Sequence, residues 1–224
     1  GVNEPDSNGY LFIGANAVAR SLAKALVAKK IKVILSDTSW ENIRAARMEN
    51  LSVYYGNPVS EHAENNLDLT GIGNMLAISP YKQLNTLSTY HYLDLLGEGN
   101  VFGLPEGDQD VRASHQSSEK YVQTRNKFDE KATFAKLASL MSKGASIKIT
   151  QLSQEFSFED YLKKHGNRLN LLFALQPDKQ LVPLGQDDKV MPQEGWEVIS
   201  LIRSTPEPTE SDKGSAVESA VEKA

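Results

Sequence analysis

Hydrophobic and polar residues follow two different periods along about the first hundred residues of the chain. Short runs that are almost wholly apolar are typical of parallel strands buried on both faces. The segments between these runs repeat apolar residues every three or four positions, as amphipathic helices do. The apolar runs predict strands over residues 10–13, 31–35, 51–55, 74–79 and 100–104. This alternation predicts an α/β fold with a Rossmann-like, doubly wound parallel sheet.

The intervening helices are predicted from their caps and their apolar spacing. We expect them over residues 18–28, 40–49, 61–69 and 81–96. Ser39 is placed to cap the second of these helices. In the fourth, residues three or four positions apart predict the apolar face of an amphipathic helix. They are Leu84, Leu87, Tyr90 or His91, and Leu95.

Residues 10–37 read as strand, tight turn, helix and strand, the pattern that opens a dinucleotide-binding βαβ unit. A turn at Gly14 would direct the N–H groups at the start of the helix toward a phosphate. Asp37 ends the second strand, 37 − 14 = 23 residues after Gly14. The acid that binds an adenosine ribose is expected roughly 20 residues after the turn. The pattern therefore predicts a nucleotide crevice between Gly14 and Asp37.

The glycine fingerprint of such units is incomplete in this chain. The pattern G-x-G-x-x-G reads Gly14-Ala15-Asn16-Ala17-Val18-Ala19, so only its first glycine is present. Ala19 is small enough for close packing of helix on strand. Asn16 tolerates a left-handed backbone, but its side chain takes space that a pyrophosphate would use. Two interpretations follow: an occupied nucleotide site, or a Rossmann unit that keeps the fold and binds nothing.

The second half of the chain has shorter helices and alternating strands, which predicts a small α+β subdomain. Residues 105–120 are expected to form a loop and residues 121–125 a sixth strand. The remaining predicted elements are helices over 133–141 and 157–165 and strands over 146–152, 169–175, 180–184 and 196–202. The two strands beside the turn at 176–179 are expected to pair as a hairpin.

These patterns divide the chain into four parts. Residues 1–9 read as a linker, 10–125 as the Rossmann-like domain and 126–203 as the α+β subdomain. Residues 204–224 are rich in Pro, Ser, Glu and Ala and are expected to form a disordered acidic tail, with a weak helix over 215–223 as the alternative.

Composition excludes several classes of function. A net charge of −5 with scattered basic residues argues against nucleic acid as a partner. The chain has no cysteine, so disulfides, thiolate metal sites and cysteine nucleophiles are excluded. No apolar run approaches the roughly 20 residues that span a bilayer. The chain begins with Gly1 rather than Met, from which we expect a processed tag or a fragment of something longer.

Several stretches together resemble one known family. They are IGANAVARSLAKAL, VILSD, YYGNPVSEHA, and NMLAIS with the helix that carries Asn85. This series is similar to RCK domains (TrkA-N or KTN domains), above all to those in the cytosolic C-terminal region of NhaP-type cation/proton antiporters. The stretch LLFALQPDKQLVPLGQDDKVMPQEGWEVISLI is similar to the small subdomain that often follows in that family.

The resemblance implies a regulatory module rather than an enzyme. Such a module would couple the binding of NAD(H), AMP or ATP to monovalent cation/proton antiport. It would act as a homodimer joined to the transmembrane antiporter domain of the same chain. It would lie at the cytoplasmic face of the bacterial inner membrane, with the present segment itself soluble.

The resemblance also implies a set of cofactor-binding residues by position and assigns no catalytic residue. They are Gly14, Asn16, Ala17, Val18, Asp37, Thr38, Asn57 and Ser79. The chain departs from the family's pattern at Asn16, where the family has its second glycine, and at Asn57, where it has an acid. The charge of Asp37 disfavours NADP, because it would repel a 2′-phosphate.

Other chemistry has weaker support in the sequence. The four histidines form no pair spaced for metal binding, so we expect no metal site; acids within 106–110 and 187–188 are the remaining candidates. Ser114-His115 lacks a hydrolase signature. Trp40 and Trp196 are interpreted as packing residues and Tyr55 as a candidate edge of an adenine pocket.

Two alternative functions stay open. A soluble NAD-dependent oxidoreductase would need a proton donor beside the nicotinamide, and the sequence nominates none. A dimerisation module with a decayed nucleotide site would explain the incomplete fingerprint.

Overall fold

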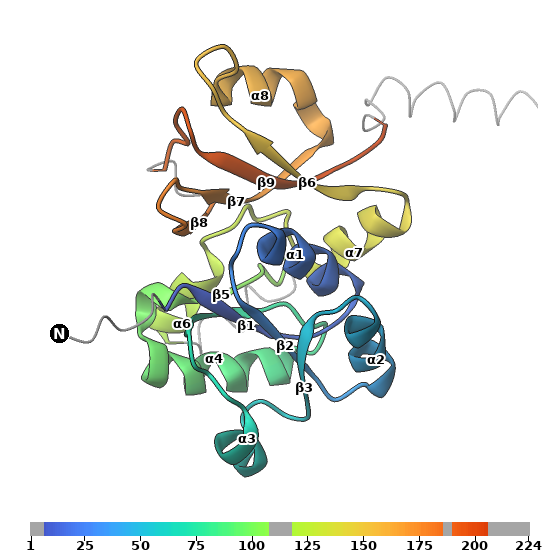
Figure 1. The fold of residues 1–224 in the computed structure, drawn as a ribbon, viewed down its shortest axis with the longest axis vertical. Coiled ribbons are helices and arrows are strands. Elements are labelled where there is room, and N and C mark those ends of the chain that lie inside the picture. Colours follow the sequence, from blue (N-terminus) through green and yellow to red (C-terminus); the bar gives the residue numbers. More distant parts are fainter. Residues whose placement is uncertain (1–6, 108–117, 186–189, 206–224) are drawn as a thin grey trace, which may run out of the picture.

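The computed structural model describes residues 7–107, 118–185 and 190–205, and two sheets dominate it (Figure 1). The first sheet is parallel, with the strand order β3-β2-β1-β4-β5. Its strands are β1 (Gly9–Ile13), β2 (Val33–Asp37), β3 (Ser52–Tyr55), β4 (Ile72–Ala77) and β5 (Val101–Gly103). The order reverses direction between β1 and β4, which confirms the predicted doubly wound, Rossmann-like fold.

Helices connect these strands as the spacing predicted. They are α1 (Ala17–Ala28), α2 (Trp40–Met48), α3 (Glu61–Asn66) and α4 (Lys82–Leu96), followed by the short turn η1 (Glu98–Asn100). Ser39 caps α2 as expected, because its hydroxyl accepts a hydrogen bond from the N–H of Asn42 at 3.3 Å.

The parallel sheet is buried on both faces. Tyr10 and Phe12 of β1 pack in one apolar cluster with α1 and α2. Leu11 and Ile13 point to the other face, where they pack with Tyr92 of α4. Successive side chains of a strand point to opposite faces, so one apolar run supplies both layers.

The second sheet is antiparallel, with the order β6-β9-β7-β8. It is formed by β6 (Ser146–Gln151), β7 (Leu169–Leu175), β8 (Leu181–Pro183) and β9 (Glu197–Ile202). The helices of this half are α6 (Glu119–Arg125), α7 (Phe134–Ser142) and α8 (Phe158–His165), with the turn η3 (Gly166–Arg168) after α8. The predicted hairpin is confirmed, since β7 pairs with β8.

The two sheets share one hydrophobic cluster, with α1 and α7 between them (Figure 1). Phe173 of β7 is fully buried, and its ring centroid lies 6.1 Å from that of Tyr10 and 5.2 Å from that of Phe128. Lys29 at the end of α1 forms an ion pair with Glu197 of β9 at 2.9 Å. The other face of the antiparallel sheet packs on Tyr161 of α8.

The sixth strand predicted over residues 121–125 is wrong, because these residues lie in α6. Ser118 caps this helix by accepting a hydrogen bond from the N–H of Tyr121. The guanidinium of Arg125 lies 4.1 Å from the centre of the Tyr121 ring. Residues four apart would lie about 13 Å apart in a strand, so the contact requires the helix.

The apolar face expected for α4 is also only partly buried. Leu87 and Leu95 are each 60 % exposed, and the buried positions are Ser88, Thr89 and Tyr92. Small side chains at Ser88 and Thr89 let the helix approach the sheet closely, and the Tyr92 hydroxyl fixes its rotation by donating to Pro58 O at 2.9 Å. The spacing of apolar residues alone does not predict the close packing at Ser88 and Thr89 or the hydrogen bond of Tyr92.

Two other expectations are not settled by the fold. Within the described ranges, no helix is long and apolar enough to cross a membrane. The tail expected at 204–224 lies, beyond residue 205, outside the described residues.

Phe173→Ala tests the shared core. We expect it to lower the free energy of unfolding by about 3–5 kcal/mol, because the substitution leaves a cavity between the two sheets. Urea denaturation measures the change, and Met48→Ala, at a position 75 % exposed, is the control, with a change within about 0.5 kcal/mol. Fluorescence of single-tryptophan variants that keep Trp40 or Trp196 should report one coincident transition. Two separate midpoints would contradict a shared core.

Candidate functional site

The loops that follow β1, β2, β3 and β4 meet at the carboxyl edge of the parallel sheet. Gly14 leaves β1 with a φ of 120°, which L side chains rarely adopt. A Cβ atom at this position would lie 3.0 Å from Cα and 3.1 Å from N of Ser79, after β4. Gly14 and Ser79 therefore face each other across the point where the strand order reverses, and only glycine fits there.

Asn16 caps α1 and at the same time ties the helix to the loop after β4. Its Oδ1 accepts a hydrogen bond from Ala19 N at 3.0 Å, and its Nδ2 donates to Ile78 O at 2.9 Å. Its φ is −66°, so the left-handed backbone that Asn tolerates is not used. The side chain passes over Gly14, since Nδ2 lies 3.1 Å from the position of a Cβ there. Asn16 thus fills space that glycine leaves open in the fingerprint.

The first turn of α1 presents backbone N–H groups at this edge. The N–H groups of Ala17 and Val18 precede the first hydrogen bond along the helix, from Arg20 N to Asn16 O. Ala17 is exposed, whereas the side chain of Val18 is buried in the core. Val18 can therefore reach a ligand only through its backbone.

Asp37 lies at the end of β2 and is 8 % exposed. Its Oδ2 accepts hydrogen bonds from Ala15 N at 2.9 Å and from Asn42 Nδ2 at 3.0 Å. Its Oδ1 accepts from Ser39 N at 2.8 Å. A carboxylate offers about four acceptor positions, so one more donor can be accommodated. Asp37 and the loop after Gly14 are joined directly.

Two further residues hold this arrangement and were missed in the sequence. Asn42 lies five residues after Asp37 and reaches back to it from α2. Arg20 Nη1 donates to Ala15 O at 2.8 Å, and its Nε lies 3.7 Å from Glu49, just after α2. The position of Asn42 in the first turn of α2 was a usable signal, whereas nothing in the spacing identifies Arg20.

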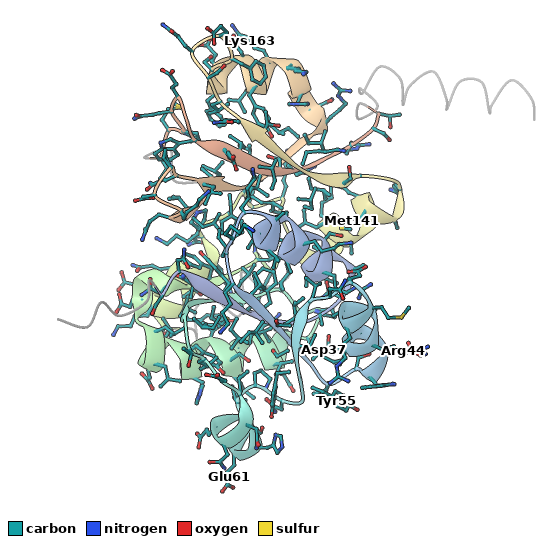
Figure 2. All side chains as sticks on the ribbon, in the orientation of Figure 1. Asp37, Arg44, Tyr55, Glu61, Met141 and Lys163 are labelled. Atoms are coloured by element: carbon teal, nitrogen blue, oxygen red, sulfur yellow. The ribbon has the colours of Figure 1, made fainter. Side chains whose placement is uncertain are left out.

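An aromatic pair borders Asp37 on the side of β3. Tyr55 is the pairing partner of Asp37 in the sheet and is 50 % exposed. Its ring lies 5.5 Å from that of Trp40, which is 49 % exposed and has the Arg47 guanidinium 5.4 Å from its ring. Figure 2 shows Asp37 and Tyr55 beside α2, which carries Arg44. Trp40 therefore packs at the surface and stays half exposed, whereas Trp196 packs against the cluster under α8.

Two of the remaining predicted site residues, Asn57 and Ser79, form hydrogen bonds within turns at the same edge. Asn57 is exposed and its Oδ1 accepts from Val59 N at 3.0 Å, while Thr38 is exposed next to Asp37. Ser79 is buried; its hydroxyl donates to Asn85 Oδ1 at 2.6 Å, and Asn85 Nδ2 donates to Ser79 O at 2.8 Å. The structure brings Gly14, Asn16 and Ser79 into contact and links Asp37 to them through Ala15.

Comparison with known proteins identifies the family. The TrkA-N domain family matches residues 10–124, which is more than half of the chain. The chain belongs to the TrkA-N domain family. This confirms the RCK/TrkA-N resemblance of the sequence. A comparison with curated proteins finds no match.

Solved structures similar to this TrkA-N chain share little sequence with it. An NAD(P)-binding domain of an exopolyphosphatase-related protein from Archaeoglobus fulgidus is 22 % identical, with 49 % of this chain and 81 % of that one covered and a TM-score of 0.37. The GsuK RCK domain is 14 % identical, with 97 % and 47 % covered and a TM-score of 0.41. The GsuK channel bound to NAD is 14 % identical, with 87 % and 36 % covered and a TM-score of 0.38. The chain thus spans less than half of the GsuK chains.

A second polar cluster of the TrkA-N domain lies past β5, on the far side of the reversal point from Asp37. Glu106 forms ion pairs with Arg125 of α6 and, at 3.8 Å, with Lys82 of α4. The Tyr121 hydroxyl lies 2.9 Å from Thr86 Oγ1 and 3.4 Å from Glu106. Burial lowers the pKa of Arg125 to about 10, so the guanidinium stays charged at neutral pH.

No metal site is found in the part of the chain that the structure describes, since no group of three His, Cys, Asp or Glu residues converges there. The acids Asp108, Asp110, Asp187 and Asp188, named as candidates from the sequence, lie outside the described residues.

Tyr92→Phe tests the anchor of the loop that carries Asn57. At neutral pH we expect it to lower the free energy of unfolding by about 0.5–1.5 kcal/mol, the net value of a hydrogen bond. Burial raises the pKa of Tyr92 to about 12, with a smaller contribution from Tyr54. Because the unfolded side chain ionises near pH 10, the wild type loses stability as the pH rises from 10 to 12, whereas phenylalanine cannot ionise.

The deficit of the variant should therefore shrink over that range. Urea denaturation at pH 7, 10 and 11 measures it. A deficit that stays constant with pH would contradict the buried, neutral Tyr92.

Proposed function

We propose that this TrkA-N domain is the cytosolic regulatory domain of a bacterial monovalent cation/proton antiporter and binds an adenine nucleotide. The observation that carries the binding claim is the hydrogen bond from Ala15 N to Asp37 Oδ2. It places the acid suited to a ribose and the N-terminus of α1, suited to a phosphate, on either side of one peptide group. In a nucleoside phosphate the ribose and the phosphate are neighbouring groups, so one ligand can contact both Asp37 and the N-terminus of α1.

Asp37 can accept a ribose hydroxyl without leaving its protein partners. Three donors hold its carboxylate in place, which reduces the entropy lost when a ligand binds. Its charge would repel a phosphate on the 2′ position of the ribose, so the proposed ligand carries a free 2′-hydroxyl.

The aromatic pair supplies a surface for the base. Tyr55 and Trp40 are half exposed beside Asp37, so a purine attached to a ribose at Asp37 can contact their rings. An aromatic ring in contact with a base contributes about 1–3 kcal/mol to binding.

The geometry favours a binding module over the alternative oxidoreductase. Asp37 is the predicted site residue with a carboxylate, and its oxygens accept three hydrogen bonds from the chain beside Gly14, Asn16 and Ser79. Asn16 and Ser79 bond to the chain itself. None of these groups has the arrangement of a general acid or base.

Three parts of the proposal rest on the resemblance of the sequence to that family. They are regulation, the homodimer, and attachment to a transmembrane antiporter domain at the cytoplasmic face of the inner membrane. Coupling requires the nucleotide to bind two conformations of the antiporter with different affinity. Transport by proteoliposomes that hold the whole antiporter should therefore respond to nucleotide, and the response should be lost in Asp37→Ala.

Calorimetry with AMP, ATP, NAD and NADH tests the binding claim. We expect at least one of these ligands to bind and to quench the fluorescence of Trp40, and we expect Trp40→Phe to remove the quenching. Asp37→Ala should weaken binding by about 1–3 kcal/mol, the cost of removing a charged acceptor. Asp68→Ala is the control, because Asp68 lies before β4 at the opposite edge of the sheet. Absence of heat with all four ligands at millimolar concentration would contradict the proposal.

A further inference from the structure

Asn16 spans the point at which a dinucleotide would cross the sheet. Its Nδ2 bonds to Ile78 O, at the end of β4, and its Oδ1 bonds to Ala19 N, in α1. In a Rossmann unit the pyrophosphate crosses here, and the second glycine of the fingerprint lets the backbone approach it. In this chain the side-chain amide of Asn16 occupies the space through which the pyrophosphate would approach the backbone. Both its oxygen and its nitrogen are hydrogen-bonded to the chain.

The far side of the crossing is filled by side chains of the protein. Arg125 of α6 lies against the end of β5, with its Cγ 3.6 Å from the position of a Cβ on Gly103. It is 11 % exposed and ion-paired with Glu106. Ser79 and Asn85 bond to each other next to Asn16. A second nucleoside on this side would have to displace this ionic and hydrogen-bonded layer.

The near side keeps the groups that one nucleoside needs. Asp37 lies there with Thr38, and Tyr55 and Trp40 are half exposed beside them. From these observations, which rest on the proposed nucleotide function, we propose that the site is a half-site. It takes an adenine mononucleotide such as AMP or ATP, and Asn16 excludes the dinucleotide NAD.

Replacing Asn16 tests this selectivity. Asn16→Gly restores the glycine of the fingerprint, and glycine at a helix N-cap costs only a few tenths of a kcal/mol. Asn16→Ser keeps a capping hydroxyl on a side chain too short to reach Ile78. Ser157→Gly, at the N-cap of α8, is the matched control, because it removes a cap far from the crevice.

Calorimetry measures AMP and NAD binding to the wild type and the three variants. In the wild type we expect AMP to bind at least about tenfold more tightly than NAD. In both Asn16 variants we expect NAD affinity to rise by about tenfold or more relative to AMP affinity. Ser157→Gly should leave both affinities unchanged. Thermal unfolding of each variant checks that it is folded.

The outcomes separate this inference from the proposed function. If NAD binds the wild type as tightly as AMP, or if neither Asn16 variant gains NAD affinity, the half-site is overturned and the nucleotide function stands. If no nucleotide binds the wild type or any variant, both proposals are overturned.

Discussion

The hydrogen bond from the Ala15 N–H to the Asp37 carboxylate is the contact on which the candidate site depends. It joins the loop after the first strand to the end of the second strand. Arg20 holds the carbonyl of the same residue, Ala15, at 2.8 Å. A loop fixed at both polar groups of one residue presents the N-terminus of α1 in a defined direction. The carboxylate is correspondingly buried, because its partners come from the chain rather than from water.

The second sheet contributes to this rigidity by packing against β1 and α1. Phe173 packs against Tyr10 in the strand that leads into Gly14, and α1 is covered by the antiparallel sheet and α7. Part of the face that a doubly wound sheet usually covers with helices is therefore covered by another sheet. A structural change in the second half of the chain would reach α1 through this shared core, which is a physical route for the proposed coupling.

The same edge shows how the fold persists although the glycine fingerprint is incomplete. Gly14 is required by its positive φ and by its contact with Ser79, whatever is bound. The second glycine of the fingerprint serves only the approach of a pyrophosphate, so its replacement by Asn16 leaves the backbone unstrained. The substitution even adds a helix cap and a bond to Ile78. Asn16 thus stabilises the turn, and the proposed half-site follows from the same side chain.

Local sequence determined the strands, most helices, the cap at Ser39 and the positions of Gly14 and Asp37, because apolar period and turn chemistry act over a few residues. It could not determine contacts between distant residues. The helix at 119–125 follows from Tyr121 contacting Thr86 and from Arg125 packing at the end of β5, and the exposure of Leu87 follows from the hydroxyl of Tyr92 reaching Pro58. Likewise, Arg20 reaches Glu49, and Trp40 borders the site beside Tyr55, only because three segments of the chain meet at one edge of the sheet. Tertiary structure alone decides such meetings, since the energies involved belong to pairs far apart in sequence.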